Sequence, residues 1–578
     1  MIKTALALLL AAAPAFSAVK NPDTLVVLNA VEPNSVDPAN AYNLQSRGLL
    51  ANVCEYLVTT VEGAAPALAP GLATSVPSRE NGQISADGRS YRFHLRRGVR
   101  FHDGSLMSPE DVKYSLLRFL LLDRDNGPSQ ELLQPILGLN STRDAAGVLR
   151  PDVFRRADQA IRVEGNDLVV TLERPYAPFL ALLARFGAVL AKKGTVAQND
   201  WDGRGETLAR YNNRKREDSP LRFGVDCTGP FRVERWDATD RAIHLVRHDG
   251  YWRGPARLKR VVIKTVEDFN VRRLSLGAGD ADVIYAESAQ RTLLKDMEGV
   301  QVLDNLPLIG FEEVVAFNLA ISTAGNPFSG SGRLDGEGIP PDFFKDPDVR
   351  KAVASLIDYD GFVRDVMGGG RRARGPVPRG LPGFDPEQAG YSYDPARAGE
   401  HLKKAWGGRL WEKGFRFTFH YSSGKAKDQV VALMIQRGLE RLNPKFHVDI
   451  RAVQIGTSIE FYATKKATLL LDVAQFTTLD PHPLFHGMMH SSYAGKVTGY
   501  VSPEADRLIE AAVAAGDPKE RERLYRRLQR LWYEDIPQIP VAEAAGVRVQ
   551  RSWVKGYVFN PTLPGAPSMS LFRDLRKE

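Results

Sequence analysis

Short apolar runs rich in β-branched residues alternate with helix-start signals along the whole chain, and this alternation most restricts the possible folds. Six runs are predicted strands, at residues 24–30, 167–173, 242–248, 260–266, 416–422 and 447–453. Strands that alternate with helices are typical of α/β layers, in which helices pack on a sheet. Because 578 residues are too many for one hydrophobic core, we expect two or three such domains.

Four predicted helices begin with the same local signal, a capping residue followed by proline. These starts are Ser108-Pro109, Asp346-Pro347, Asp394-Pro395 and Asp517-Pro518. A serine or aspartate side chain accepts a free backbone N–H in the first turn, where proline loses no hydrogen bond. In the last of these helices, Glu520 is placed to complete a capping box with Asp517.

The formal net charge of +8 is small for a chain of this length, and its most basic segment, residues 520–532, has the pattern of a packed surface helix. Five apolar residues recur there at helical spacing: Leu524, Tyr525, Leu528, Leu531 and Trp532. The arginines between them then form the solvated face of that helix. Acidic residues are interleaved and no nucleic-acid-binding motif is present, so we expect no nucleic-acid partner.

The N-terminus has the pattern of a secretory signal peptide over residues 1–17. Lys3 precedes an apolar run at residues 5–13, and the small residues Ala15 and Ser17 suit cleavage before Ala18. The run is too short to span a bilayer. We therefore expect a secreted, soluble, periplasmic protein whose signal peptide is cleaved.

The two cysteines, Cys54 and Cys227, exclude a disulfide-dense scaffold. A single bridge is possible in an oxidising compartment, and two free, buried thiols are equally compatible with the sequence. The sequence leaves both alternatives open.

The usual catalytic and cofactor motifs are incomplete in this sequence. Gly277-Ala278-Gly279 lacks the third glycine of a dinucleotide loop, and Ser423-Gly424-Lys425 lacks the flanking residues of a phosphate loop. There is no GxSxG and no HExxH. We expect a protein without a cofactor that is not an enzyme, although a triad assembled in space keeps a periplasmic hydrolase as an alternative.

The segment LDPHPLFHGMMHSS carries His482, His486 and His490 at a spacing of four and four. On a helix, that spacing places all three imidazoles in one stripe. Imidazole and the nearby methionine sulfurs would suit copper or nickel. The other interpretation is that the histidines pack or contact an organic ligand, with the apolar residues of the segment in the core.

Three long blocks resemble the extracellular solute-binding proteins of family 5, the peptide-, nickel- and related binding proteins of ABC importers. They are YRFHLRRGVRFHDGSLMSPEDVKYSLLR from Tyr91, TGPFRVERWDATDRAIHLVRHDGYWRGPARLKRVVIKTVED from Thr228, and PDVRKAVASLIDYDGFVRDVMGGG from Pro347. The resemblance implies an α/β fold like that of type II periplasmic binding proteins, a two-lobe clam with a hinge and an additional family-specific domain. It implies lobe one at 18–68, 200–285 and 536–578, the extra domain at 69–199, and lobe two at 286–535.

The resemblance also implies a function and a site. A monomer would capture an oligopeptide or a peptide-like, conjugated solute between its lobes and deliver it to an inner-membrane ABC permease. The implied ligand-binding residues are Gln475, Phe476, Thr477, Asp480 and His482, with Tyr42 and Asn43 from the first lobe.

Peptide-binding members of the family usually carry aspartate at the position of Thr477, where it pairs with the ligand's α-amino group. The hydroxyl of Thr477 cannot supply that charge, so Asp480 is the candidate substitute if it faces the cleft. Asp480-Pro481-His482 is similar to a step in nickel-binding members. A metal-chelate-binding protein that uses His482, His486 and His490 is therefore the alternative.

Overall fold

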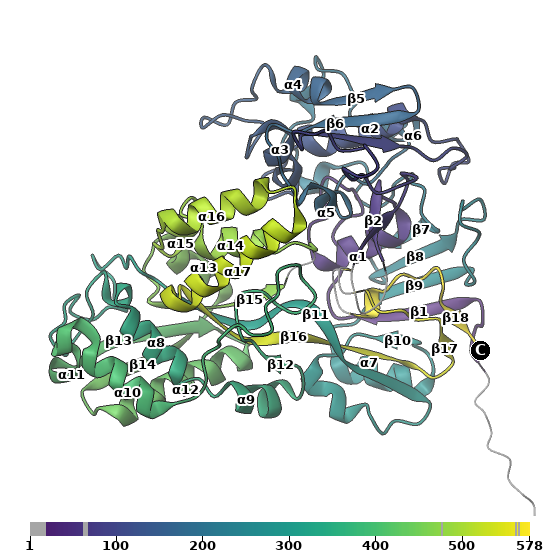
Figure 1. Cartoon of the computed structure of the whole chain (residues 1–578). Helices are drawn as coiled ribbons and strands as arrows, with labels where there is room; N and C mark the ends of the chain where they lie inside the picture. The colour runs from purple at the N-terminus through teal and green to yellow at the C-terminus, as the bar shows by residue number, and fades with distance from the viewer. Residues whose placement is uncertain (1–18, 62–66, 476–477, 561–562, 564–566) are drawn as a thin grey trace, which may run out of the picture.

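The computed structural model describes residues 19–61, 67–475, 478–560, 563 and 567–578. The predicted signal peptide lies outside this part of the chain. Figure 1 shows three regions: one holds both described chain ends, a second lies above it, and a third extends to the left. We call them the first lobe, the extra domain and the second lobe.

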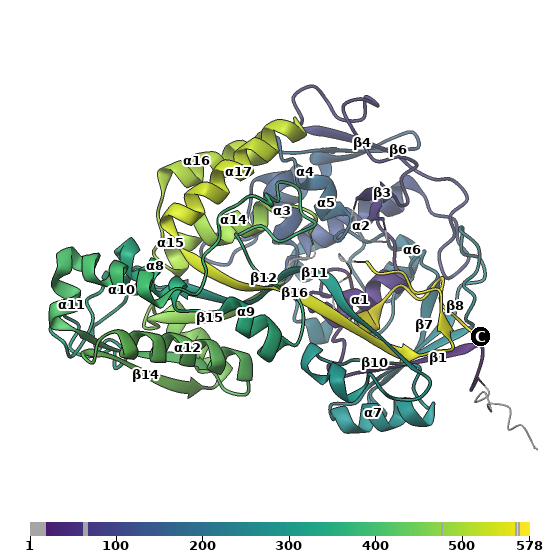
Figure 2. The same cartoon turned by 60° about the horizontal axis from the view of Figure 1, so that its bottom comes forward.

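A mixed sheet of nine strands runs through both lobes. Its order is β15, β11, β16, β10, β1, β9, β8, β7, with β12 also paired to β16. Their bounds are β1 Thr24–Asn29, β7 Phe231–Asp237, β8 Ala242–Arg247, β9 Arg260–Thr265, β10 Val283–Ile284, β11 Val300–Phe317, β12 Arg371–Arg372, β15 Leu469–Gln475 and β16 Gln538–Arg551. The long antiparallel strands β11 and β16 pass from one lobe to the other, and Figure 2 shows them side by side.

In the first lobe, β1 pairs in parallel with β9 and β10. Short helices and hairpins connect the strands of this part of the sheet. The further elements here are α1 Leu44–Val53, β2 Val58–Thr60, β3 Leu68–Pro70, α7 Phe269–Ala278, β17 Val554–Lys555 and β18 Arg576–Lys577. A hydrophobic cluster fills this lobe, with members from Leu25 to Leu575. The two ends of the described chain therefore share one core.

The extra domain is a three-stranded antiparallel sheet in the order β4, β6, β5, with helices packed on it. Its elements are β4 Ser90–His94, α2 Pro109–Leu121, α3 Gln130–Leu137, α4 Val153–Ala160, β5 Ile161–Glu164, β6 Asp167–Thr171, α5 Phe179–Leu183 and α6 Lys192–Ala197. Its core cluster runs from Leu57 to Leu208 and also includes Val513 of the second lobe. The extra domain thus packs against both lobes.

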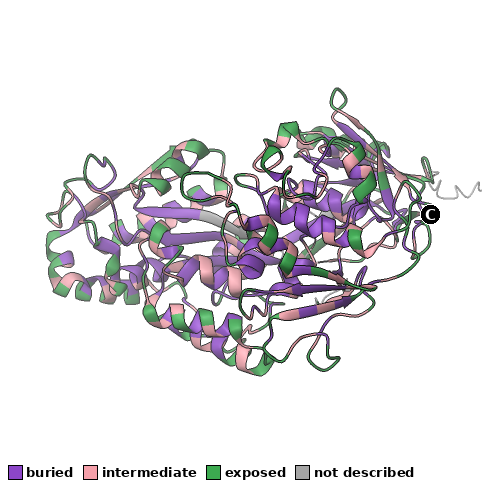
Figure 3. Cartoon of the chain, turned by 90° about the horizontal axis from the view of Figure 1, so that it is seen from above, coloured by how far each residue is buried: buried purple, intermediate pink, exposed green. Residues whose placement is uncertain are grey.

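The second lobe is largely helical around the crossing strands and the parallel pair β13 and β14. Its elements are α8 Pro347–Ser355, α9 Tyr359–Gly361, α10 Pro395–Lys404, α11 Arg409–Lys413, β13 Phe415–Ser422, α12 Ala426–Leu442, β14 Phe446–Val453, α13 Ile455–Ala463, α14 His482–Met489, α15 Ala494–Val497, α16 Pro503–Ala514 and α17 Pro518–Asp535. Figure 3 shows buried residues concentrated along the sheet and on the inner faces of the helices. The exact division of the chain into lobes stays a prediction.

All six predicted strands are present, as β1, β6, β8, β9, β13 and β14, and the four proline-capped helices are α2, α8, α10 and α17. Ser108 forms a complete capping box with Asp111. At α17 the predicted box is wrong, because the Glu520 carboxylate binds Arg523 instead, at 2.7 and 2.8 Å. The expected apolar residues of α17 are buried, from Leu524 to Trp532. None of the helices within the described ranges has the length and apolar character required to cross a bilayer.

Cys54 and Cys227 form a disulfide bond, with their Cα atoms 5.0 Å apart. Both residues are buried, and the bond joins the end of α1 to the segment that precedes β7. Of the two alternatives that the sequence left open, the structure therefore has the bridge.

Strand β11 is irregular where it enters the second lobe. Its register against β15 shifts between Phe311 and Val314, and Glu313 lies within this β-bulge with a φ of 57°. The side chain of Glu313 is buried against Asp428 of α12, and the adjacent Glu312 binds Lys427 at 3.0 Å. The bulge directs the carboxyl group of Glu313 into the interior, where it lies next to that of Asp428.

Candidate ligand-binding cavity

A cavity of about 1330 Å³ lies between the extra domain and the second lobe. Helix α3 of the extra domain supplies Gln130 and Glu131, strands β11 and β15 supply Val314 and Leu471, and α14 and its flanks supply most of one wall. Pockets for drug-sized ligands typically measure roughly 300–1,000 Å³. This cavity can therefore hold a solute larger than an ordinary metabolite.

Helix α14 is held in place by an ion pair just before its first turn and by the packing of its apolar side chains. The carboxylate of Asp480 accepts the backbone N–H of His482 at 2.9 Å, and both of its oxygens accept from Arg521 of α17, at 2.9 and 2.8 Å. Behind the helix, four apolar side chains are buried in the core of the second lobe: Leu484, Phe485, Met488 and Met489. This anchoring positions α14 so that its histidines line the cavity, together with parts of Leu484 and Met488.

That face carries the three histidines in a row, as their spacing predicts. The ring centroids of His482 and His486 are 5.5 Å apart, and those of His486 and His490 are 4.8 Å apart. Tyr176 of the extra domain meets His482 edge to face at 5.6 Å. Burial, with smaller contributions from the neighbouring cations and histidines, lowers the pKa of His482 to about 3, and burial also lowers the pKa of His486. Near neutral pH these two rings form an uncharged aromatic wall.

The row does not have the geometry of a metal site. An imidazole binds metal through a lone pair that lies in the ring plane, and the rings of His486 and His490 are stacked only 20° from parallel. Their lone pairs therefore do not converge on one point. Across the described parts of the chain, no three His, Cys, Asp or Glu side chains come together as a group that could hold a metal ion.

Glu131 is a carboxyl group that lines this cavity. Its side chain accepts a hydrogen bond from the hydroxyl of Tyr42 at 3.1 Å. Burial raises the pKa of Glu131, although Tyr42 and Arg47 oppose the shift. A carboxyl group whose pKa is raised by its surroundings regains its charge most favourably when a cation binds next to it. Glu131 is thus suited to meet a positively charged group of a ligand.

The predicted site residues fall into different environments. His482 lines the cavity. Tyr42 does not line it but donates a hydrogen bond to Glu131, which does. Asn43 caps α1 by accepting the N–H of Ser46 at 2.8 Å. Asp480 is 3% exposed, and its carboxylate forms an ion pair with Arg521. It therefore does not face the cavity.

Three further predictions concern the end of β15. The backbone of Gln475 pairs with Gly310 of β11, which places this position at the end of β15, beside a crossing strand. Phe476 and Thr477 lie outside the described residues. The next residue, Thr478, is buried and accepts a hydrogen bond from Arg185 of the extra domain at 3.0 Å.

Sequence reasoning missed the apolar side of the cavity. Ile455 and Ile459 on α13 are 59% and 62% exposed, yet both line it, as does Tyr462 one turn further on. Their spacing of four residues is a helical pattern that ordinarily indicates core packing. Exposed isoleucines beside a large cavity instead indicate contact with something that binds there.

Comparison with known proteins identifies the family. The sequence profile described as "Bacterial extracellular solute-binding proteins, family 5 Middle" matches residues 67–496. The chain belongs to this family. It is thus a family 5 solute-binding protein, and family 5 consists of binding proteins rather than enzymes. The predicted α/β fold with two lobes and an extra domain is confirmed.

Individual relatives of this family 5 protein match over nearly its whole length. It is 26% identical to "Di/tripeptide-binding protein 2" of Pseudomonas aeruginosa over 96% of each chain, and 26% identical to "Heme-binding protein A" of Haemophilus influenzae over 93% of this chain and 90% of that one. The periplasmic binding protein DppA of Helicobacter pylori, solved with the peptide STSA, superposes with a TM-score of 0.68 at 23% identity, covering 96% of this chain and 98% of that chain. The last comparison establishes a shared fold.

Proposed function

We propose that this family 5 protein captures a peptide or peptide-like solute in the cavity between the extra domain and the second lobe. The observation that carries the proposal is the composition of that cavity. Its 1330 Å³ combine an aromatic histidine wall, the exposed isoleucines of α13 and the half-buried carboxyl group of Glu131. Apolar walls with a few placed polar groups suit a ligand that has both side chains and a charged end. The names of two relatives, a di/tripeptide-binding protein and a dipeptide-binding protein, support the same ligand class, as does the solved complex of DppA with the peptide STSA.

In this proposal the protein acts as a monomer in the periplasm after its signal peptide is cleaved. It delivers the solute to the permease of an ABC importer, which recognises the ligand-bound arrangement of the lobes. No bond of the solute is broken. Tyr42 and His482 contribute to binding, and Asn43 and Asp480 hold the elements that carry the contacts.

A thermal-shift series tests this proposal. We expect di- to pentapeptides, or peptide conjugates, to stabilise protein that has been unfolded, stripped of carried-over ligand and refolded. Ligand at about 100 times its dissociation constant should add about 2.7 kcal/mol to the free energy of unfolding. Ni(II) with and without free histidine is measured in parallel. A shift that only the metal produces, and that is lost when the three histidines are changed to alanine, would replace peptide binding by metal-chelate binding.

The Glu131→Gln variant tests the charged end of the site. For peptides with a free α-amine, we expect its dissociation constant to rise at least about tenfold, because a buried ammonium then lacks a counter-charge. Peptides acetylated at the N-terminus should bind the variant and the unchanged protein alike. Glu110→Gln, in the first turn of α2, is the matched control. Equal losses for free and acetylated peptides would show that Glu131 does not recognise the amine.

A further inference from the structure

Five aromatic side chains follow one another along the large cavity, and we call them the aromatic row: Tyr176, His482, His486, His490 and Tyr493. Tyr176 meets His482 edge to face, and the three histidines follow at centroid distances of 5.5 and 4.8 Å. The ring of Tyr493 lies 6.1 Å from that of His486, tilted by 45°. Each ring is therefore within aromatic contact distance of another, and all five line the cavity.

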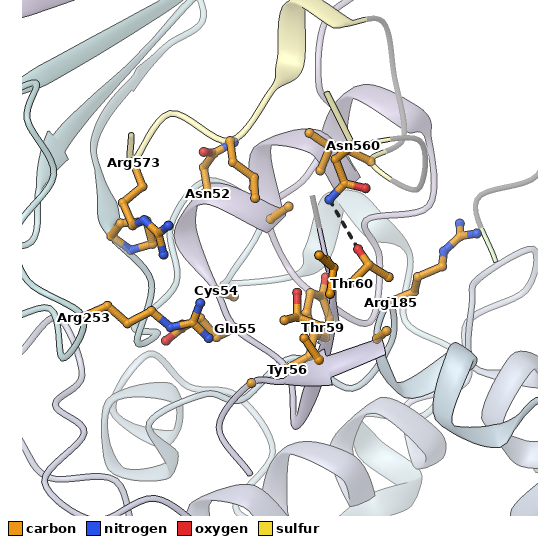
Figure 4. A pocket seen from close by; sticks show the side chains of 18 of the residues that line it. Asn52, Cys54, Glu55, Tyr56, Thr59, Thr60, Arg185, Arg253, Asn560 and Arg573 are labelled. Atoms are coloured by element: carbon orange, nitrogen blue, oxygen red, sulfur yellow. Dashed lines mark hydrogen bonds between the residues drawn. The ribbon is translucent and has the colours of Figure 1, made fainter. Parts of the chain in front are cut away.

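A smaller cavity, of about 420 Å³, provides a contrast. It lies where the end of α1, the β2–β3 hairpin and the C-terminal segment meet. Figure 4 shows polar and charged side chains around it, with a hydrogen bond from Asn560 to Thr60 at 3.3 Å. Among the described residues that line it there is no histidine, and its only aromatic side chains are those of Tyr56 and Tyr251. The row of rings is therefore a particular feature of the large cavity.

Polar neighbours from the protein already occupy ring nitrogens of two members of the row. The hydroxyl of Ser492 lies 2.7 Å from Nδ1 of His490 and 3.5 Å from Nε2 of His486. Nε2 of His490 lies 3.7 Å from a carboxylate oxygen of Glu510. The contacts that His486 and His490 have left to offer a ligand are therefore mainly those of their ring carbons. The edge of an aromatic ring carries partial positive charge and packs favourably against the face of a second ring.

The two ends of the row differ in exposure. Tyr176 is 8% exposed, whereas Tyr493 is 53% exposed although it lines the cavity. The Tyr493 end thus has ring surface that no protein group covers. Ile455 and Ile459 also offer exposed apolar surface, but such surface favours aliphatic and aromatic ligand groups alike. Only an aromatic ligand group gains in addition from contact with the rings, by about two- to twelvefold in affinity for one ring pair.

We propose that the aromatic row makes this protein selective for peptides or peptide-like solutes that carry an aromatic side chain, whose ring packs against His486 and Tyr493. This inference rests on the proposed function, since it requires that a peptide-like solute enters the large cavity. His486 and Tyr493 are then specificity-determining residues. They discriminate between aromatic and aliphatic side chains of similar size, and no chemical step is involved.

The test is isothermal titration calorimetry near neutral pH with protein stripped of carried-over ligand. The probes are trialanine peptides in which one residue at a time is replaced by phenylalanine, and the same peptides with cyclohexylalanine, which is similar in size and apolar but has no π system. At one position or more, we expect the phenylalanine peptide to bind at least about threefold more tightly than its cyclohexylalanine counterpart. His486→Leu and Tyr493→Leu should each remove that preference, whereas Tyr493→Phe, which keeps the ring, should retain it.

His447→Leu is the matched control, because His447 lies on β14 and does not line the cavity. It should leave the preference unchanged, and an equal loss in this variant would contradict the role of the row. If peptides bind but cyclohexylalanine binds as tightly as phenylalanine at every position, the selectivity is overturned while the proposed function stands. If none of the peptides binds, both are overturned. Each variant is checked by its unfolding transition, and His486 and Tyr493 lie in different segments, so one that fails to fold leaves the other.

Discussion

Replacing Arg118 with methionine is expected to lower the free energy of unfolding by about 3–5 kcal/mol, the largest effect of any single substitution that we predict. Arg118 lies on α2 and is 1% exposed. It binds Asp37 at 2.6 and 2.9 Å and Asp200 at 3.1 and 2.8 Å, so one guanidinium neutralises two buried carboxylates. Although burial opposes ionisation of Asp37, the charge and hydrogen bonds of Arg118 hold its pKa below the ordinary value. Removing Arg118 would leave both acids buried without a cation.

Arg92 provides a matched control for this prediction. It also lies in the extra domain and binds two carboxylates, Glu164 at 2.6 Å and Asp167 at 3.1 Å, but its side chain is 39% exposed. Arg92→Met should therefore cost no more than about 1 kcal/mol. Denaturant unfolding of both variants measures the difference. If Asp37→Asn and Asp200→Asn are added to Arg118→Met, part of the lost stability should return. Similar costs for the two arginine variants would contradict the role of burial.

Replacing Glu313 with glutamine is expected to remove a pH dependence of stability. Burial first, and the adjacent Asp428 second, raise the pKa of Glu313 from 4.5 to about 9. Between these values the native state holds a proton that the unfolded state has released, so stability falls as pH rises, by up to about 1.4 kcal/mol per pH unit. The contribution is fully present below about pH 4.5 and is lost as pH approaches about 9.

The measurement is denaturant unfolding at several pH values for the unchanged protein and for Glu313→Gln. Relative to the variant, the unchanged protein should lose about 2–3 kcal/mol between about pH 5.5 and about pH 8. Glu337→Gln removes a carboxylate whose side chain is 80% exposed, and it serves as the control. Parallel pH profiles for the unchanged protein and the Glu313 variant would show that folding does not raise the pKa of Glu313. Lys425, Lys427 and Glu312 lie nearby and are unchanged in every variant.

The local elements of the fold were predictable because their causes are local. Alternating β-branched residues specified β8 and β9, and the Ser108-Pro109 signal specified the start of α2. The failed capping box at Glu520 shows the limit of such reasoning, because Arg523 one turn away competes for the same carboxylate. The family resemblance supplied the two-lobed fold, which no local pattern contains.

The candidate site was less predictable, since it depends on contacts between distant segments. The histidine spacing correctly indicated one face of a helix, yet only the packing of α14 against α17 shows that this face lines a cavity. Asp480 is occupied by Arg521, 41 positions away in sequence, and no spacing rule identifies such a partner. Glu131 and Tyr176 belong to another domain, and nothing in their own neighbourhoods marks them as binding residues.

The pairing of β11 with β16 has a mechanical consequence for the two lobes. Its hydrogen bonding is regular at both ends, but the register shifts between Leu303 and Leu306 and again between Pro307 and Phe311. Asn305, with a φ of 53°, lies in the first interruption, where its side chain accepts the backbone N–H of Gly370. A two-stranded ribbon resists twisting where its ladder is continuous and bends where bulges break it. Residues 303–311 are therefore where this connection between the lobes bends most readily, and the continuous pairing on either side of them makes it stiffer than a single-stranded linker.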